Sequence, residues 1–225
     1  MSLIHPTVVD AKGRYAFNFL RRWQMKKPVM MSLAVILLII VLVVISFVLM
    51  YNGLVKAEKG IEEAKAQIET VCQRRLDLIP NLVETVKGYA KHEKQTLTAI
   101  TEARSKAHGI LKEIATETSL NKKQLSELAT SQTELTSALK TIFALVENYP
   151  DLKASSNFSA LQNQLEGTEN RISVARQRYN SAVRFYNTKV ATFPRNIVAS
   201  MFGFQKNTDY FEAVDGAKRP VKVEL

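Results

Sequence analysis

A charged cluster around position 75 is the part of this 225-residue sequence whose side chains could do chemistry. Arg74 and Asp77 are three residues apart, a spacing that lets the two side chains pair on one helix face. Arg75 falls on the apolar stripe of the same segment, so its guanidinium must lose its water and needs a carboxylate partner. The candidate carboxylates are Asp77, Glu166 and Glu169.

A second charged patch contains Glu169, Arg171 and Arg176. One interpretation joins both patches into a buried or half-buried polar network that fixes the register of helices. The other interpretation is that the arginines bind an anionic ligand, but no phosphate-loop geometry in the sequence supports it. The residues assigned to the network are Arg74, Arg75, Asp77, Glu169, Arg171 and Arg176.

Other patterns for catalysis or metal binding are absent from the sequence. His92-Glu93 begins like a zinc-protease motif, but Thr96 stands where the second histidine would be. Neither a Gly-x-x-x-x-Gly-Lys-Ser/Thr phosphate loop nor a Gly-x-Ser-x-Gly elbow occurs. Cys72, the single cysteine, lies beside the apolar stripe, which favours a buried, inert thiol over a nucleophile. We therefore expect no catalytic residue, no metal and no cofactor.

The element that precedes these residues is an apolar stretch at residues 29–50. From Val29 to Leu49 it contains no charge, no proline and no glycine. About 20 such residues in a helix cross a bilayer, whereas the apolar core of a signal peptide has only about 7–15. We therefore predict a retained, single transmembrane helix, with Val29, Ile36, Leu42 and Leu49 in the membrane.

The flanks of this span predict its orientation. Residues 1–28 hold six basic residues and one acidic residue, so this short basic and aromatic segment carries +5 of the chain's +10. Such a segment attracts anionic headgroups, and residues 13–27 form either a short interfacial helix or a flexible basic flank. The positive-inside rule places the N-terminus in the cytoplasm and the C-terminal domain outside it. No nucleic-acid recognition module accompanies the charge.

Apolar residues recur with alternating steps of three and four after the span, as in helices that pack through one face. The pattern predicts a first helix over 51–114, a second over 121–147 and a third over 157–192. Pro80 predicts a kink in the first helix near Leu76, with a sharp break into two helices as the alternative. Strand signals are absent. The fold class is therefore all-α: a transmembrane helix followed by an elongated antiparallel bundle of three to four helices, with a long, kinked first helix.

The end of the chain differs in character. A short helix at 195–201 is followed by Gly203 and an extended aromatic stretch, and residues 212–225 read as a mobile tail. The aromatic side chains either pack onto the bundle or form an interaction patch. The residues of this patch are Phe202, Phe204 and Phe211.

The predicted first helix is longer than its predicted partners. At about 1.5 Å per residue, residues 51–114 would reach about 95 Å, and the other two helices about half of that. The membrane-proximal half of the first helix would then lack a partner within the chain. This mismatch predicts a homo-oligomer.

Several long motifs resemble those of the LemA family. They are Tyr51-Asn52-Gly53-Leu54-Val55, the run from Arg74 to Tyr89 (RRLDLIPNLVETVKGY), and the run from Leu165 to Asn180. The resemblance covers residues 51–211 and implies a membrane anchor followed by an antiparallel helical bundle, without an established enzymatic activity. Lys65 departs from the family pattern, which has an aromatic residue near this position.

These observations predict a non-catalytic, membrane-anchored scaffold that self-associates at the bacterial inner membrane. A single-pass topology with a periplasmic domain is expected from the flanking charges. The alternative is a signalling or adaptor module that binds a membrane partner, such as an envelope protease. An enzyme or ligand receptor that uses the Arg75 cluster is the third hypothesis.

Overall fold

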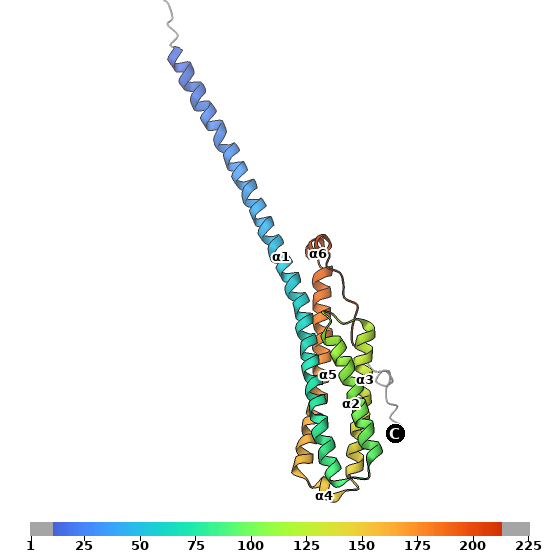
Figure 1. Cartoon of the computed structure of the whole chain (residues 1–225). Coiled ribbons are helices and arrows are strands. Elements are labelled where there is room, and N and C mark those ends of the chain that lie inside the picture. The colour runs from blue at the N-terminus through green and yellow to red at the C-terminus, as the bar shows by residue number, and fades with distance from the viewer. Residues whose placement is uncertain (1–10, 213–225) are drawn as a thin grey trace, which may run out of the picture. The chain divides into compact units, whose positions relative to one another are not determined.

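Helices account for all regular structure in the described part of the chain (Figure 1). A computed structural model describes the backbone of residues 11–212 and the side chains of residues 29–212. The predicted tail after Glu212, like the first ten residues, lies outside this range. The helices are α1 (Ala11–Tyr89), α2 (Lys94–Ala115), α3 (Lys122–Val146), α4 (Pro150–Lys153), α5 (Ser156–Ala191) and α6 (Arg195–Phe202). Two compact units, Met1–Tyr51 and Asn52–Leu225, are described separately.

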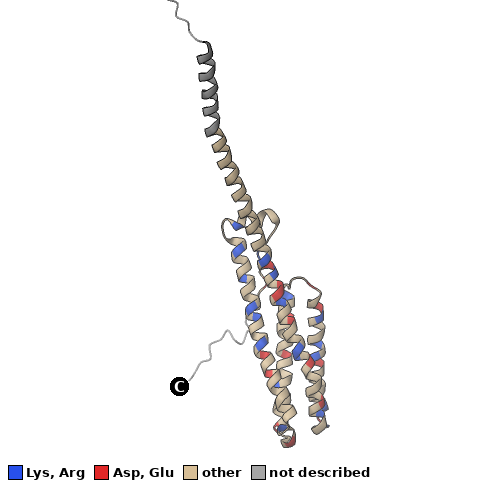
Figure 2. Cartoon of the chain, turned by 90° about the vertical axis from the view of Figure 1, so that its left-hand side faces the viewer, with Lys and Arg blue, Asp and Glu red and all other residues tan. Residues whose placement is uncertain are grey.

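The first unit contains the apolar part of α1, which is the one candidate membrane span among the described residues. Residues 29–50 contain no Lys, Arg, Asp or Glu, so the ribbon carries neither charge colour there in Figure 2. Val29, Ile36, Leu42 and Leu49 are each more than half exposed, as expected for a helix that faces lipid. Residues 11–28 are also helical, so the flexible alternative for residues 13–27 is wrong, while the interfacial location stays a prediction.

The two hydroxyls of the span are satisfied within the helix. Ser32 Oγ donates to the Val29 carbonyl and Ser46 Oγ to the Leu42 carbonyl, both at 2.8 Å. Polar groups in hydrocarbon need such internal partners, because no water is available there. The serines therefore do not argue against a membrane span.

The second unit is an antiparallel bundle of α1 from Asn52 onward with α2, α3 and α5 (Figure 1). Arg178 on α5 donates to Gln67 on α1, and Lys106 on α2 pairs with Glu134 on α3 at 2.7 Å. The apolar stripes of all four helices meet in one core. Its members include Leu54, Ile61, Ile68, Leu76, Ile79, Ile100, Leu111, Leu128, Leu135, Ile142, Leu165, Ile172 and Val183.

The first helix of the bundle is shorter than the sequence pattern predicts. It ends at Tyr89, and the chain turns through residues 90–93 before α2 returns along α1. The prediction of one helix over 51–114 is therefore wrong. Folding back allows Val86 before the turn, Ala90 at its start and Ile100 after it to be buried at the same time. A single straight helix could not cover both stripes from within the chain.

Helix α1 continues through Pro80, so the alternative of a sharp break near Leu76 is also wrong. Proline lacks the N–H that would bond the carbonyl four residues earlier, and here that carbonyl belongs to Leu76. Arg104 on α2 replaces the missing donor, because its Nε donates to Leu76 O at 2.9 Å. The helix thus continues past Pro80, and a neighbouring helix satisfies the carbonyl that Pro80 leaves free.

Helices α2 and α3 do not extend to the end of the bundle where α5 and α6 meet (Figure 1). There the α2–α3 loop, residues 116–121, and an extended segment after α6 take their place. We name residues 204–212 the strap. It leaves α6 through Gly203, whose φ of 78° is readily adopted only by glycine. The strap, the loop, α1 and α5 together line a pocket of about 600 Å³.

Two asparagines on α5 hold the strap by its backbone. Asn187 donates to the Asn207 carbonyl at 2.7 Å and accepts from the Asn207 N–H at 2.8 Å. Asn180 exchanges the same two bonds with Phe211, both at 2.9 Å. Near the start of the bundle part of α1, Leu54, Ala57 and Ile61 are buried, so this segment has partners within its own chain. The length mismatch that predicted a homo-oligomer is absent from the structure.

Replacing Arg104 with methionine removes the donor to Leu76 O and should lower the free energy of unfolding by about 1 kcal/mol. In a Pro80→Ala background the alanine N–H can take over that carbonyl, so the same Arg104→Met change should cost less. Chemical denaturation of the four proteins in mild detergent, followed by circular dichroism, measures this coupling. Equal losses in both backgrounds would contradict the role assigned to Arg104.

Candidate functional site

The charged cluster of the sequence centres on Arg75, which is buried between three helices. Its side chain is 2% exposed, and its Nη1 lies 2.7 Å from Glu169 Oε2 on α5. Nη2 donates to the Thr136 hydroxyl on α3 at 2.8 Å, and that hydroxyl lies 3.0 Å from the same Glu169 oxygen. Gln132 Oε1, also on α3, is 3.3 Å from Nη1. The cluster therefore ties α1, α3 and α5 together.

The charge of Arg75 persists despite its burial. Removal from water lowers the pKa of the guanidinium, and the Glu169 carboxylate acts in the opposite direction. Arginine starts from so high a pKa that it stays protonated at neutral pH. Glu169 is half exposed, so this ion pair lies at the edge of the core and its carboxylate keeps part of its hydration.

A second arginine lies next to this pair. The guanidinium carbon of Arg176 is 5.5 Å from the centre of the Phe211 ring, which meets the Tyr179 ring edge-on at 5.4 Å. Burial lowers the pKa of Arg176 and raises that of Tyr179 to about 12. The Tyr179 hydroxyl and two Arg176 nitrogens are buried without a hydrogen-bond partner among the described residues. Such unsatisfied groups cost stability.

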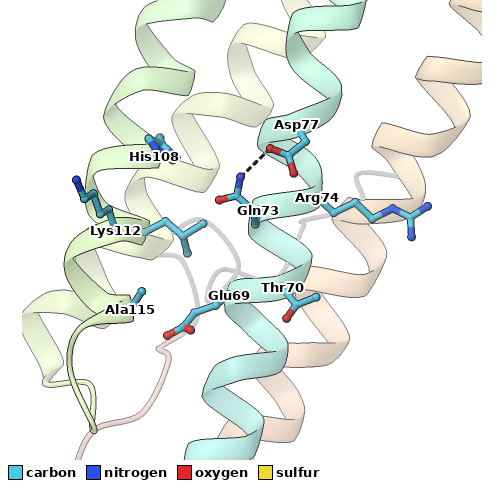
Figure 3. Close-up of a pocket in the computed structure, with 9 residues that line it drawn as sticks. Glu69, Thr70, Gln73, Arg74, Asp77, His108, Lys112 and Ala115 are labelled. Atoms are coloured by element: carbon cyan, nitrogen blue, oxygen red, sulfur yellow. Dashed lines mark hydrogen bonds between the residues drawn. The ribbon is translucent and has the colours of Figure 1, made fainter.

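The structure does not bring all six network residues together. Arg75, Glu169 and Arg176 are clustered, whereas Arg74 and Arg171 are exposed and form no hydrogen bond or ion pair within the described range. The predicted pairing of Arg74 with Asp77 is wrong. Gln73, one helical turn before Asp77, donates to its carboxylate at 2.6 Å. Arg74 extends away from α2 in Figure 3.

An open groove of about 810 Å³ runs between α1 and α2 beside this cluster (Figure 3). It carries charges of both signs, which come from two separate stretches of sequence. Sequence reasoning missed the α2 side, although His108 and Lys112 are four residues apart and so share a helix face. The lining residues are Glu69, Thr70, Gln73, Arg74, Asp77, His108, Leu111, Lys112 and Ala115.

Lys65, the departure from the family pattern, has a structural role that the sequence did not reveal. Its side chain is buried, pairs with Glu69 at 2.7 Å and donates to the Glu117 carbonyl at 2.7 Å. Glu117 lies in the α2–α3 loop, so this lysine holds the loop against α1.

The predicted C-terminal aromatic patch is divided by the structure. Phe211 is buried, because its ring packs on Tyr179 and its backbone is bound by Asn180. Phe211 therefore belongs to the bundle, and its assignment to an interaction patch is wrong. Phe204 is half-buried and Phe202 is exposed.

Comparison with known proteins gives this architecture a family. Residues 64–225, well over half of the chain, match the LemA family. The chain belongs to the LemA family. It is 29% identical over 148 residues to protein LemA of Metamycoplasma hominis, a match that covers 66% of this chain and 63% of that protein.

Magnetosome proteins are also related to this LemA-family chain. Magnetosome protein MamQ 2 of Paramagnetospirillum magneticum is 24% identical over 186 residues, 76% of this chain and 68% of its own length. Magnetosome protein MamQ of Magnetospirillum gryphiswaldense is 22% identical over 209 residues, with coverage of 86% and 76%. The names LemA and MamQ are not names of enzymes. Family membership and the candidate span describe a membrane-associated helical protein.

Glu169→Gln removes the charge that faces Arg75 but keeps the size of the side chain. We expect a loss of about 2 kcal/mol in the free energy of unfolding, less than for a fully buried pair because Glu169 is half exposed. Glu166→Gln, on an exposed position of the same helix, is the matched control and should leave the stability unchanged. Equal effects of the two changes in denaturation experiments would contradict the assignment of Glu169 as the ion-pair partner of Arg75.

Burial raises the pKa of the Cys72 thiol to about 11, so it stays protonated at neutral pH. We expect iodoacetamide to leave the folded protein unmodified and to alkylate it once denaturant opens the bundle. Above the ordinary pKa of 9.0 the unfolded thiol ionises and the folded one does not, so stability falls as the pH rises toward about 11. Cys72→Ala should remove this part of the alkaline loss. Rapid alkylation without denaturant would contradict the burial.

Proposed function

We propose that this LemA-family protein is a non-catalytic scaffold, anchored in the bacterial inner membrane by residues 29–50. The observation that carries the proposal is that the charged side chain at the centre of the cluster forms its bonds inside the bundle. The Arg75 cluster is the part of the sequence with the most residues that could do chemistry. In the structure its polar groups bond to one another between α1, α3 and α5. A cluster used in this way gives a rigid module rather than a reaction site.

The scaffold would self-associate through the groove between α1 and α2. Asp77 lies on its α1 side and Lys112 on its α2 side, so the groove offers both signs of charge. A second copy related by two-fold symmetry would present the same groove and could match acid to base.

The proposed topology has the N-terminus in the cytoplasm and the bundle in the periplasm. It rests on the basic excess of residues 1–28 compared with the mixed charges that directly follow the span. The same basic segment would attract anionic headgroups on the cytoplasmic side.

In mild detergent, light scattering of the full-length protein should give a defined mass above that of one chain. Lys112→Glu reverses a groove charge and should lower this mass toward the monomer. Lys140→Glu, an exposed change on α3 away from the groove residues, is the control and should not alter it. A monomer at all concentrations would contradict self-association and favour the adaptor function, in which the groove binds another membrane protein such as an envelope protease.

A further inference from the structure

The α6 end of the bundle exposes a row of large apolar side chains. Phe193, Ile197 and Met201 follow at intervals of four residues and are 74%, 50% and 66% exposed. This spacing places Ile197 and Met201 on one face of α6, and Phe193 lies in the turn just before that helix. Val198 and Ala199 point the other way and are buried. The helix is therefore amphipathic, with its apolar row facing away from the bundle.

Three cations accompany this row. They are Lys56 on α1, Lys189 on α5 and Arg195 at the start of α6. Burial lowers the pKa of Lys189, and the positive charges of Arg195 and Lys56 lower it further because they repel the Lys189 ammonium. None of the three has an ion pair within the described residues, so positive charge is left unbalanced here.

Lys189 also links this end of the bundle to the chain that leaves the membrane. Its Nζ donates to the Gly53 carbonyl at 3.2 Å. Gly53 follows Met50, the last residue of the candidate span, by three residues, which reach at most about 11 Å when fully extended. The headgroup layer is about 5–7 Å thick on each side of a bilayer. The short covalent link to Gly53 and this hydrogen bond together keep Lys189 near lipid headgroups.

We propose that the α6 face, formed by Phe193, Ile197 and Met201 with Lys56, Lys189 and Arg195, docks on the surface of an anionic phospholipid bilayer. The apolar row enters the boundary between headgroups and acyl chains, and the cations bind lipid phosphates. This inference rests on the proposed membrane anchor and adds a second attachment to the same bilayer. It requires neither self-association nor a protein partner.

The test uses the full-length chain reconstituted into phosphatidylcholine vesicles, with or without phosphatidylglycerol. Met201→Cys is labelled with a polarity-sensitive fluorophore, and the native Cys72 stays unlabelled because it is 0% exposed. Asn148→Cys, in the turn between α3 and α4, is the matched control. We expect a blue-shifted emission and severalfold stronger quenching by brominated lipid at position 201 than at position 148. The effect should be larger with phosphatidylglycerol, and Lys56→Gln combined with Arg195→Gln should remove that dependence.

Equal emission and quenching at positions 201 and 148 would overturn the proposal. A blue shift without quenching by brominated lipid would also overturn it, because protein, such as a second copy, would then cover the α6 face. Alkaline carbonate extraction separates this failure from that of the anchor. If the protein stays in the membrane, only the docking of α6 is wrong. Release into the wash would contradict the proposed function itself.

Discussion

The burial of one guanidinium limits how the helices of the bundle can be arranged. A charge removed from water must be met by fixed acceptors, and Arg75 finds them on α3 and α5 in Gln132, Thr136 and Glu169. If either helix shifted by one residue along its axis, these acceptors would leave the guanidinium uncompensated. An apolar core alone tolerates such shifts more readily. The aliphatic stripes therefore permit more than one register of the helices, and the polar cluster selects one of them.

Long side chains that bind the backbone of another element extend this constraint along the bundle. Arg104 satisfies Leu76 beside Pro80, Lys65 binds the carbonyl of Glu117 in the α2–α3 loop, and Lys189 binds that of Gly53. Asn180 and Asn187 do the same for the strap. In each case the carbonyl or N–H lies where regular helix bonding is interrupted or has ended, or where one helix lies against another. These bonds therefore allow elements of unequal length to close one core.

The sequence predicted the helices better than it predicted the side-chain contacts between them. The alternation of three and four located α3 and α5 to within about one residue at each end, because each of these helices buries one stripe. It missed the turn at 90–93, since the apolar pattern resumes at Leu97 and no proline marks the break. For Arg75 it limited the partner to three carboxylates, and only the packing of α5 selected Glu169. The Arg74–Asp77 pair failed because spacing alone does not show that Gln73 competes for the same carboxylate.

The path of the strap determines the point on the bundle at which the described part of the chain ends. The strap ends at Glu212, whose carboxylate is 2.9 Å from Lys122 Nζ at the first residue of α3. That point lies on the flank of the bundle, beside the α2–α3 loop (Figure 1). A reporter or affinity tag fused directly after Glu212 would thus be attached at the bundle's side and not at its tip. An insertion in the turn at 147–149, far from the strap, would leave this flank undisturbed.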